Sequence, residues 1–304
     1  MNIFITGATG VLGRPVVQSL VAAGHTVRAL SRSEHNAATI RSLGAKPVSA
    51  DLFDATELKQ ILVGSNAVVH LATKIPPTAK IGRRTAWLEN DHLRRDGTRN
   101  LVEAARAIDS IETFIYPGYS FVYPDSSDNW IDASTTPTHS SAILQSTLDA
   151  EEAVAQFAAE GHRGLSLRMG SFYGPETPDP LTYARRGIAV FPGRSEAYLP
   201  QIWVQDAASA IVTALTEPIP SGIYDVVDDE PLTRGELITV MAQAVGRKHL
   251  LHPPTPVMRM LTGVVYDVMT RSLRISNRRF KEASSWQPEI PDARIGWTKL
   301  AQTN

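Results

Sequence analysis

The sequence predicts an α/β fold in which a parallel, doubly wound sheet carries helices on both faces and a smaller lobe follows it. Two observations predict this fold. Short β-branched or apolar runs alternate with amphipathic stretches through the first 170 residues, a pattern typical of βαβ units with right-handed crossovers. A glycine-rich turn, Gly7–Gly13, lies between the first predicted strand and the first predicted helix, where such folds bind dinucleotides.

The predicted strands are short runs of buried-type residues. They cover Ile3–Thr6, Thr26–Leu30, Lys46–Ala50, Ala67–Leu71, Thr113–Tyr116 and Leu165–Met169. Between them, apolar residues recur at three- and four-residue spacing, which predicts helices. These helices are expected over Arg14–Ala23, Thr56–Leu62, Leu93–Ile108 and Leu144–Glu160, with Gly24, Gly64 and Gly161 placed to end three of them.

The pattern loosens after Gly174-Pro175 into a stretch rich in proline and glycine, which is typical of a chain leaving one domain for another. We therefore expect a Rossmann domain over residues 1–174, to which residues 201–226 return. Residues 175–200 and 227–304 are expected to form a small substrate-binding lobe. A later strand over Gly222–Val227 and a helix over Thr233–Val245 are also predicted.

Composition argues against several classes of partner. The 30 basic and 31 acidic residues leave a formal net charge of -1, so no overall field favours nucleic acid or an anionic membrane. The chain has no cysteine, which removes disulfides, thiolate nucleophiles and cysteine metal sites. The N-terminus has no signal-peptide pattern, and no run approaches the roughly 18 apolar residues of a membrane span. We expect a cytoplasmic protein with a small-molecule substrate.

Each glycine of the turn Thr6-Gly7-Ala8-Thr9-Gly10-Val11-Leu12-Gly13 has a physical role in a dinucleotide site. Gly7 permits the tight turn, Gly10 lets the backbone approach a pyrophosphate, and Gly13 allows the helix to pack closely on the strand. Thr9, Val11 and Leu12 lie at the helix N-terminus, where free N–H groups attract anions. The alternative is a glycine-rich turn that binds no ligand.

The end of the second predicted strand favours NADP over NAD. NAD-binding folds usually place an acidic residue there to hold the ribose 2′-hydroxyl, but this chain has Ser31 followed by Arg32. A hydroxyl and a guanidinium suit a 2′-phosphate, which an acid would repel. The alternative for Arg32 is a solvated surface cation.

Two further strand ends should reach the same cofactor. Asp51-Leu52 follows the third predicted strand and Leu71-Ala72-Thr73 follows the fourth, and ligands of open α/β sheets bind at the carboxyl ends of strands. These residues are expected to line the adenine and ribose. Asp51 has the alternative role of a helix N-cap or turn residue.

Several motifs in order resemble the extended short-chain dehydrogenase/reductase superfamily, which includes sugar-nucleotide epimerases and dehydratases. Besides the glycine turn and Asp51-Leu52, they are Val69–Ala72, Gly97–Ala105, Leu167–Pro175, Trp203–Ala208 and Tyr224–Asp228. The resemblance implies that the first lobe binds NAD(P) and that the segments after Pro175 cover the nicotinamide. Met169, at the end of the sixth predicted strand, completes the expected cofactor contacts.

The chain departs from that family at the catalytic residues. Members normally move a proton with a Tyr four residues ahead of a Lys, assisted by a Ser or Thr after the fifth strand. Aligning Leu148–Glu152 with the family helix puts Ile143 at the tyrosine position and Thr147 at the lysine position, and Tyr119 stands where the Ser or Thr belongs. An isoleucine cannot transfer a proton.

Tyr119 is therefore the candidate catalytic residue. At the end of the fifth strand its phenol should face the ligand, and without a lysine its pKa should stay near ~10, so it can donate a proton but is a poor base. The alternative is an aromatic wall of the pocket. Strand alternation should send Ser120 to the opposite face.

The two nearby histidines have alternatives of their own. His70 lies inside an apolar strand and is expected to be a core residue, and His139 is expected at the surface with a possible reach to the pocket mouth. Histidine titrates near neutrality, so either could in principle transfer a proton. No spacing indicates a metal site.

Charged and aromatic loop residues have simple interpretations. Lys74 is a ligand-binding candidate or a solvated loop charge, and Trp130 stacks on a ligand or anchors its loop. The pairs Arg83-Arg84 and Arg94-Arg95 are expected to be solvated helix faces.

Three functions are consistent with this sequence. The first is an NADP-dependent oxidoreductase with a non-standard proton donor, acting on a small carbonyl or conjugated substrate. The second is a catalytically silent module that senses NADP(H) or a ligand. The third is a non-redox isomerase or lyase with a structural cofactor. The resemblance also implies a homodimer formed through the helices at Leu93–Ile108 and Leu144–Glu160.

Overall fold

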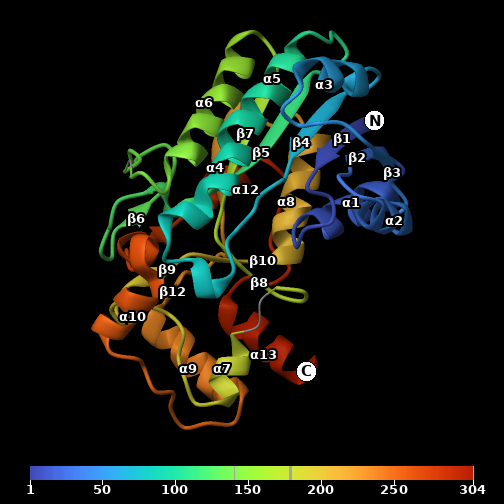
Figure 1. Cartoon of the computed structure of the whole chain (residues 1–304). Coiled ribbons are helices and arrows are strands. Elements are labelled where there is room, and N and C mark those ends of the chain that lie inside the picture. Colours follow the sequence, from blue (N-terminus) through green and yellow to red (C-terminus); the bar gives the residue numbers. More distant parts are fainter. Residues whose placement is uncertain (140, 178–179, 304) are drawn as a thin grey trace.

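A seven-stranded parallel sheet forms the centre of the larger lobe, in the order β11-β7-β5-β4-β1-β2-β3 (Figure 1). The computed structural model describes residues 1–139, 141–177 and 180–303. The sheet strands are β1 (Asn2–Thr6), β2 (Thr26–Leu30), β3 (Lys46–Val48), β4 (Ala67–His70), β5 (Thr113–Tyr119), β7 (Arg163–Met169) and β11 (Gly222–Val226). The order reverses between β1 and β4, the point at which doubly wound folds bind ligands. The predicted fold class is confirmed.

Helices cover both faces of this sheet. One face carries α1 (Gly13–Ala22) and α8 (Val204–Thr216), and the other carries α3 (Ala55–Leu62), α5 (Thr98–Arg106) and α6 (Gln145–Ala159). Side chains of β1 alternate between the two resulting cores: Ile3 and Ile5 pack with α1 and α8, whereas Phe4 packs with α3, α5 and α6. This alternation explains why the strands are continuously apolar, since a parallel sheet is buried on both faces.

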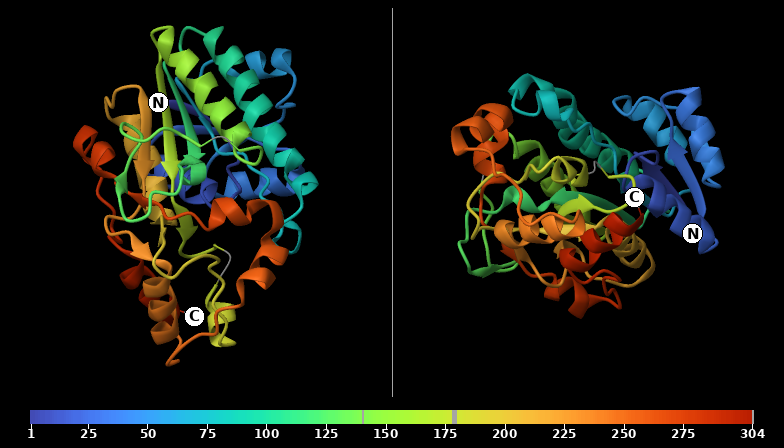
Figure 2. Two further views of the ribbon diagram at one scale, coloured as in Figure 1. Left: turned by 90° about the vertical axis from the view of Figure 1, so that its left-hand side faces the viewer. Right: turned by 90° about the horizontal axis from the view of Figure 1, so that it is seen from below.

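The smaller lobe lies below the carboxyl edge of the sheet (Figures 1 and 2). Its helices are α7 (Leu181–Arg185), α9 (Arg234–Ala244), α10 (Thr255–Thr262), α11 (Tyr266–Met269) and α13 (Ala293–Thr303). Its short strand pairs are β8 (Ser171–Tyr173) with β10 (Gln201–Trp203), β9 (Tyr198–Leu199) with β12 (Leu232–Thr233), and β6 (Trp130–Ile131) with β13 (Arg274–Ile275). A capping box between Thr233 and Glu236 begins α9, which satisfies two otherwise unpaired N–H groups.

One stretch of the C-terminal region packs against the sheet instead of the smaller lobe. Phe280, in α12 (Arg278–Ala283), and Trp286 belong to the same buried cluster as β11 and α8. The Trp286 indole donates to the carbonyl of Asp206 at 3.1 Å. These two aromatic side chains cover apolar surface at the β11 edge, so the expectation that all of residues 227–304 form the small lobe is wrong here.

Two other local predictions differ from the structure. Strand β5 was expected to end at Tyr116, yet it continues to Tyr119 in register with β7. Pro117 lies beyond the last residue that pairs with β4, Ile115, so no ladder bond to β4 requires its missing N–H. Helix α2 (Glu34–Ser42), capped by the Ser33 hydroxyl, was not expected.

Within the described ranges, no helix has both the length and the apolar character to cross a bilayer.

Candidate cofactor and substrate site

Two of the three glycines of the turn are required by the fold itself. Gly7 has φ +72°, and a Cβ there would lie 2.5 Å from the carbonyl carbon of Leu71 and 2.6 Å from the nitrogen of Ala72. A Cβ on Gly13 would collide with the Gly7 carbonyl oxygen and the Ala8 backbone. Gly7 therefore lets the turn pass the end of β4, and Gly13 lets α1 start close under that turn.

Gly10 has a different environment. A Cβ at Gly10 would meet only the Gly7 carbonyl oxygen, at 3.3 Å, and Gly10 has no positive φ. The folded chain tolerates a side chain here, so the glycine is better explained by a group that approaches from the cleft. Helix α1 has no side-chain cap, and in the described part of the chain the N–H groups of Val11 and Leu12 have no backbone acceptor. This uncapped helix end fits a pyrophosphate.

The turn opens onto a cleft of about 1260 Å³ formed at the ends of β1 to β4. Most of the predicted cofactor residues line it: Gly7, Thr9, Gly10, Ser31, Arg32, Asp51, Leu52, Leu71, Ala72 and Thr73. Seven residues that were not among the predicted cofactor contacts line it as well: Thr6, Leu30, Asn36, Ser49, Ala50, Phe53 and Leu93. Val11, Leu12 and Gly13 do not line the cleft, and Met169 is buried in β7 and lines neither this cleft nor the adjoining pocket.

Cationic side chains stand at the β2 end of the cleft. The Arg32 guanidinium and the Lys74 ammonium each lie 3.8 Å from Glu89 Oε1, and all three side chains are more than half exposed. Such exposed pairs are weak, and their members can turn toward another ligand. The Ser31 hydroxyl donates to the Ser33 carbonyl at 2.8 Å, so an arriving phosphate would receive its strongest contact from Arg32.

Asp51 lines the cleft and also holds a turn. Its Oδ1 accepts the Phe53 N–H at 2.9 Å, while the N-cap of α3 is Asp54. The alternative turn role of Asp51 is therefore present, the N-cap role is not, and its contact with a cofactor stays a prediction.

His70 is a buried structural residue. Its Nε2 lies 3.1 Å from the Leu93 carbonyl and its Nδ1 lies 2.6 Å from the Thr6 hydroxyl. Burial lowers the pKa of His70 to about 4, so the ring is neutral near pH 7 and Nε2 carries the proton that Leu93 accepts. The interpretation of His70 as a core residue is confirmed. His139 is exposed and donates its backbone N–H to the Val122 carbonyl.

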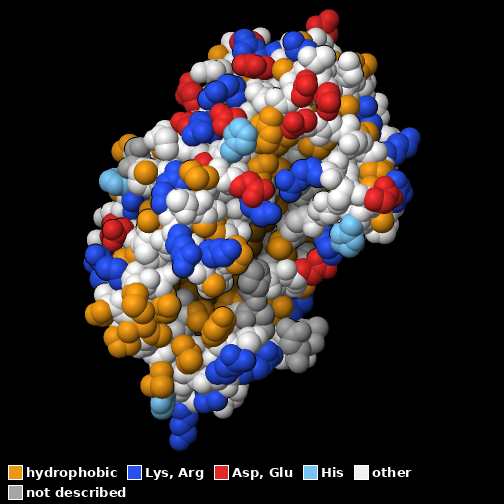
Figure 3. All heavy atoms as spheres, in the orientation of Figure 1, with side chains coloured by type: hydrophobic (Ala, Val, Ile, Leu, Met, Phe, Trp, Pro, Cys, Tyr) orange, Lys and Arg blue, Asp and Glu red, His pale blue; other side chains and the backbone are white. Residues whose placement is uncertain are grey.

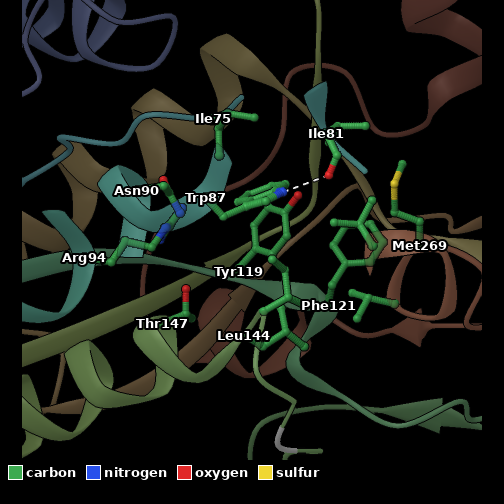
Figure 4. Close-up of a pocket in the computed structure, with 13 residues that line it drawn as sticks. Ile75, Ile81, Trp87, Asn90, Arg94, Tyr119, Phe121, Leu144, Thr147 and Met269 are labelled. Atoms are coloured by element: carbon green, nitrogen blue, oxygen red, sulfur yellow. Dashed lines mark hydrogen bonds between the residues drawn. The ribbon is translucent and has the colours of Figure 1, made fainter. Parts of the chain in front are cut away.

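A second pocket lies next to the cleft, with about 580 Å³ of space free of protein atoms, part of which is open to solvent (Figure 4). Its walls are mainly apolar: Ile75, Ile81, Trp87, Phe121, Ile143, Leu144, Val265, Val268 and Met269. Asn90, Arg94, Tyr119 and Thr147 are its polar members. Thr73 and Leu93 line the cleft, whereas Ile75 and Arg94 line the pocket. Because these residues are close neighbours in the chain, the cleft and the pocket lie next to each other. An apolar pocket with few polar groups is the usual form of a small-molecule site.

The smaller lobe forms one wall of this pocket, and its outer surface over α10 carries exposed hydrophobic side chains. Val265, Val268 and Met269 come from the segment after α10. Hydrophobic side chains gather over α10 on the surface, at the lower left of Figure 3, where Val257, Met260, Leu261 and Val264 are exposed. Residues from both lobes therefore line this pocket.

Tyr119 faces this pocket from the end of β5 (Figure 4). Its ring packs 5.1 Å from that of Phe121. Loss of solvent raises the pKa of Tyr119, and the charge of Arg94 offsets this only in part; the phenol is therefore protonated near neutral pH. The neighbouring Ser120 points the other way and donates to the Arg168 carbonyl at 3.1 Å, as strand alternation predicts.

Ile143 and Thr147 both line the pocket that contains Tyr119. These are the positions that were aligned with the tyrosine and lysine of the related family. An aliphatic group and a hydroxyl therefore occupy this wall. The pocket contains no lysine within the ranges described.

Arg94 corrects a prediction. It was expected on a solvated helix face, but only 7% of it is exposed. The helix between α4 (Leu88–His92) and α5 contains a π-helical turn, η3 (Leu93–Gly97), and such turns are frequent at functional sites. Arg94 lies in this turn and lines the pocket, and its NH1 donates to the Tyr116 hydroxyl at 2.7 Å. Arg95 remains on the outer face and contacts Asp96.

The remaining loop candidates lie away from both spaces. Trp130 is 52% exposed, and the Arg274 guanidinium stacks on its ring at 4.4 Å. Trp130 thus anchors β6 to β13. Arg84 is bound to Asp91 at 2.6 Å, whereas Arg83 is exposed as expected.

Comparison with known proteins agrees with this geometry. A model of the NAD dependent epimerase/dehydratase family matches residues 3–226. The 3-diazoavenalumate denitrifying reductase of a Streptomyces species is 29% identical over 97% of this chain and 99% of its own. The 2-alkyl-3-oxoalkanoate reductase of Shewanella oneidensis is 28% identical over 91% of this chain and 73% of its own.

Solved structures show the same fold. Human epimerase family protein SDR39U1, solved with NADPH, superposes with a TM-score of 0.85 at 20% identity and full coverage of both chains. UDP-glucose 4-epimerase of Thermus thermophilus, in complex with NAD, gives a TM-score of 0.75 at 22% identity, covering 99% of this chain and 98% of that one.

Proposed function

Because this chain belongs to the NAD dependent epimerase/dehydratase family, we propose that it is an NADP-dependent reductase of a small carbonyl or conjugated compound. The single observation that carries this proposal is the adjacency of the glycine-turn cleft and the apolar pocket that contains Tyr119. Two relatives similar to this chain over most of its length are named reductases, which supports the same class of reaction.

The choice of NADP rests on the β2 end of the cleft. The residues at the end of β2 are Ser31 and Arg32, so this position has no acidic residue to hold a 2′-hydroxyl. Arg32 lines the cleft, and its ion pair with Glu89 is exposed. A phosphate can accept two parallel hydrogen bonds from a guanidinium. That interaction is stronger than the present contact of Arg32 with one Glu89 oxygen at 3.8 Å. The NADPH in the human relative's structure supports this choice.

The bound cofactor would supply a hydride to the substrate and leave as NADP⁺. The protein's own residues then have three tasks. The apolar walls exclude water and hold the body of the substrate. Tyr119 donates a hydrogen bond to the reacting oxygen and passes its proton to it, after which the phenolate recovers a proton from solvent. Its raised pKa suits an acid and makes it a poor base.

This atypical arrangement favours reduction over oxidation. In the related family a lysine lowers the tyrosine pKa so that the phenolate can remove a proton. Here Ile143 and Thr147 supply neither the tyrosine nor the lysine. A protonated phenol can finish a reduction but cannot begin an alcohol oxidation near neutral pH.

The test combines purified protein with NADPH and a panel of aldehydes, ketones and conjugated carbonyl compounds, following the absorbance of the reduced nicotinamide. The variant Tyr119→Phe should lower kcat by about 10²-fold or more, the usual contribution of a positioned acid, with NADPH affinity unchanged. Tyr183→Phe, which changes an exposed tyrosine on α7, is the matched control.

Other results would separate the alternatives. Turnover that survives in Tyr119→Phe would remove the proposed proton donor. Tight NADPH binding without turnover on any compound would favour a sensing module instead, for which the absence of the tyrosine and lysine pair is the supporting observation.

A further inference from the structure

Arg94 is a buried cation with no carboxylate partner in the portion of the chain that the structure describes. It is 7% exposed, and among the residues that the structure describes its contacts are the Tyr116 hydroxyl and the faces of the Tyr116 and Tyr119 rings, at 6.0 Å and 5.8 Å from its guanidinium carbon. Burying an unpaired charge is strongly unfavourable, and a buried charge that faces a pocket is a candidate for binding a ligand of opposite charge.

The nearby acids are each already engaged by another cation. Asp91 is held by Arg84 at 2.6 Å and by the Ser146 hydroxyl at 2.8 Å. Asp96 contacts Arg95 and His92 on the outer face. The buried Glu151 makes two hydrogen bonds to Arg168, at 2.9 Å and 2.7 Å. No acid in this part of the described structure is left for Arg94.

The guanidinium and a second donor share one wall of the pocket. Asn90, four residues earlier in the chain, also lines the pocket and is 3% exposed. Its Oδ1 accepts the Lys74 N–H at 3.1 Å, which orients the amide. Figure 4 shows Asn90 and Arg94 together at one end of the pocket, Trp87 and Tyr119 in the middle, and Met269 at the other end. Apart from the Thr147 hydroxyl, the rest of the lining is apolar.

We propose that the substrate is a compact aromatic or branched aliphatic acid whose carboxylate binds Arg94 and Asn90, with its apolar body against Trp87, Phe121 and Leu144. This inference rests on the proposed function, since it names the substrate class of the same pocket. A carboxylate accepts two parallel N–H groups from a guanidinium, and burial strengthens that pairing. Because Arg94 lies near Tyr119, the reducible bond lies within a few bonds of the carboxylate.

The experiment measures binding and requires no turnover. Protein saturated with NADP⁺ is titrated calorimetrically with cinnamate, phenylacetate and 4-methylpentanoate, and with the corresponding primary amides. Each amide has nearly the shape of its acid but no charge. The acids should bind at least tenfold more tightly than the amides in the unmodified protein, a comparison that depends on no variant.

Variants then assign the charge to one residue. Arg94→Met should weaken acid binding at least tenfold and leave amide binding unchanged, whereas Arg94→Lys should recover part of the loss. Arg95→Met removes the adjacent arginine on the outer face and should have no effect. Amides that bind as well as acids, acids that bind Arg94→Met normally, or no binding of any acid to NADP⁺-loaded protein would each overturn the proposal. A separate NADPH titration shows whether the cofactor assignment fails instead.

Discussion

Replacing Gly10 by alanine separates what the fold requires from what the cofactor requires. The added Cβ would meet one protein atom, the Gly7 carbonyl oxygen, at 3.3 Å. A shift of a few tenths of an ångström relieves that contact. Alanine also lowers the conformational entropy of the unfolded chain, which raises the free energy of unfolding by about 0.4–1 kcal/mol. The free energy of unfolding should therefore stay within about 1 kcal/mol of the original, a Tm change of about 2–4 °C at most.

The same methyl group would stand where the backbone must approach a pyrophosphate. It would lengthen the hydrogen bonds from the backbone N–H groups to the phosphate oxygens, each of which contributes about 1.5–3 kcal/mol. Breaking even one of them predicts NADPH affinity weaker by at least about tenfold. Gly13→Ala is the contrasting variant. Its Cβ would collide with the Gly7 and Ala8 backbone, so stability and NADPH binding should both fall.

The assay is a thermal melt followed by circular dichroism, with NADPH titrations of each variant. If Gly10→Ala melts normally and binds NADPH with unchanged affinity, the ligand does not approach Gly10 and the reasoning is refuted. If Gly13→Ala is as stable as the original, the account of the close helix start is wrong.

Two further predictions concern cofactor choice and pH. Arg32→Ala should weaken NADPH binding by about tenfold and leave NADH binding unchanged, because only NADPH carries the 2′-phosphate; equal effects in parallel titrations would contradict this. His70 has a folded pKa of about 4 against an ordinary 6.5, so below about pH 6.5 the unfolded chain binds a proton that the folded chain does not. The free energy of unfolding should therefore fall by on the order of 3 kcal/mol as the pH drops from about 6.5 to about 4. His70→Gln, which cannot titrate, should show a shallower dependence of Tm on pH, and an identical dependence would refute the assignment.

The fold and the cofactor cleft were largely predictable because their signals are local. A strand, a glycine turn and a helix follow one another within the first 22 residues, and Gly7 and Gly13 are explained by the backbone that surrounds them. The strand ends at Ser31, Asp51 and Leu71 meet in one cleft because parallel strands bring their carboxyl ends to one edge.

The pocket was less predictable because its walls come together only through tertiary packing. Arg94 is followed by Arg95, and a pair of arginines in a helix normally indicates a solvated face. Successive side chains on a helix point in different directions, and tertiary packing decides that Arg94 lines the pocket while Arg95 contacts Asp96 outside it. Sequence spacing based on a regular helix cannot reveal this.

Long-range packing also explains the misassigned C-terminal stretch. Phe280 and Trp286 lie more than fifty residues from β11 in sequence but share its core. Nothing in the local pattern of residues 278–286 identifies which lobe they cover, since both lobes offer apolar surface. The spacing that predicted α9 gave no information about the packing of residues 278–286 against the larger lobe.

Calorimetric titration of the unmodified protein with NADPH and NADH tests the central claim most directly. The account predicts a single site that binds NADPH more tightly than NADH, with the affinity held by the glycine turn and Arg32. Binding of neither nucleotide to protein that is folded by circular dichroism would contradict it.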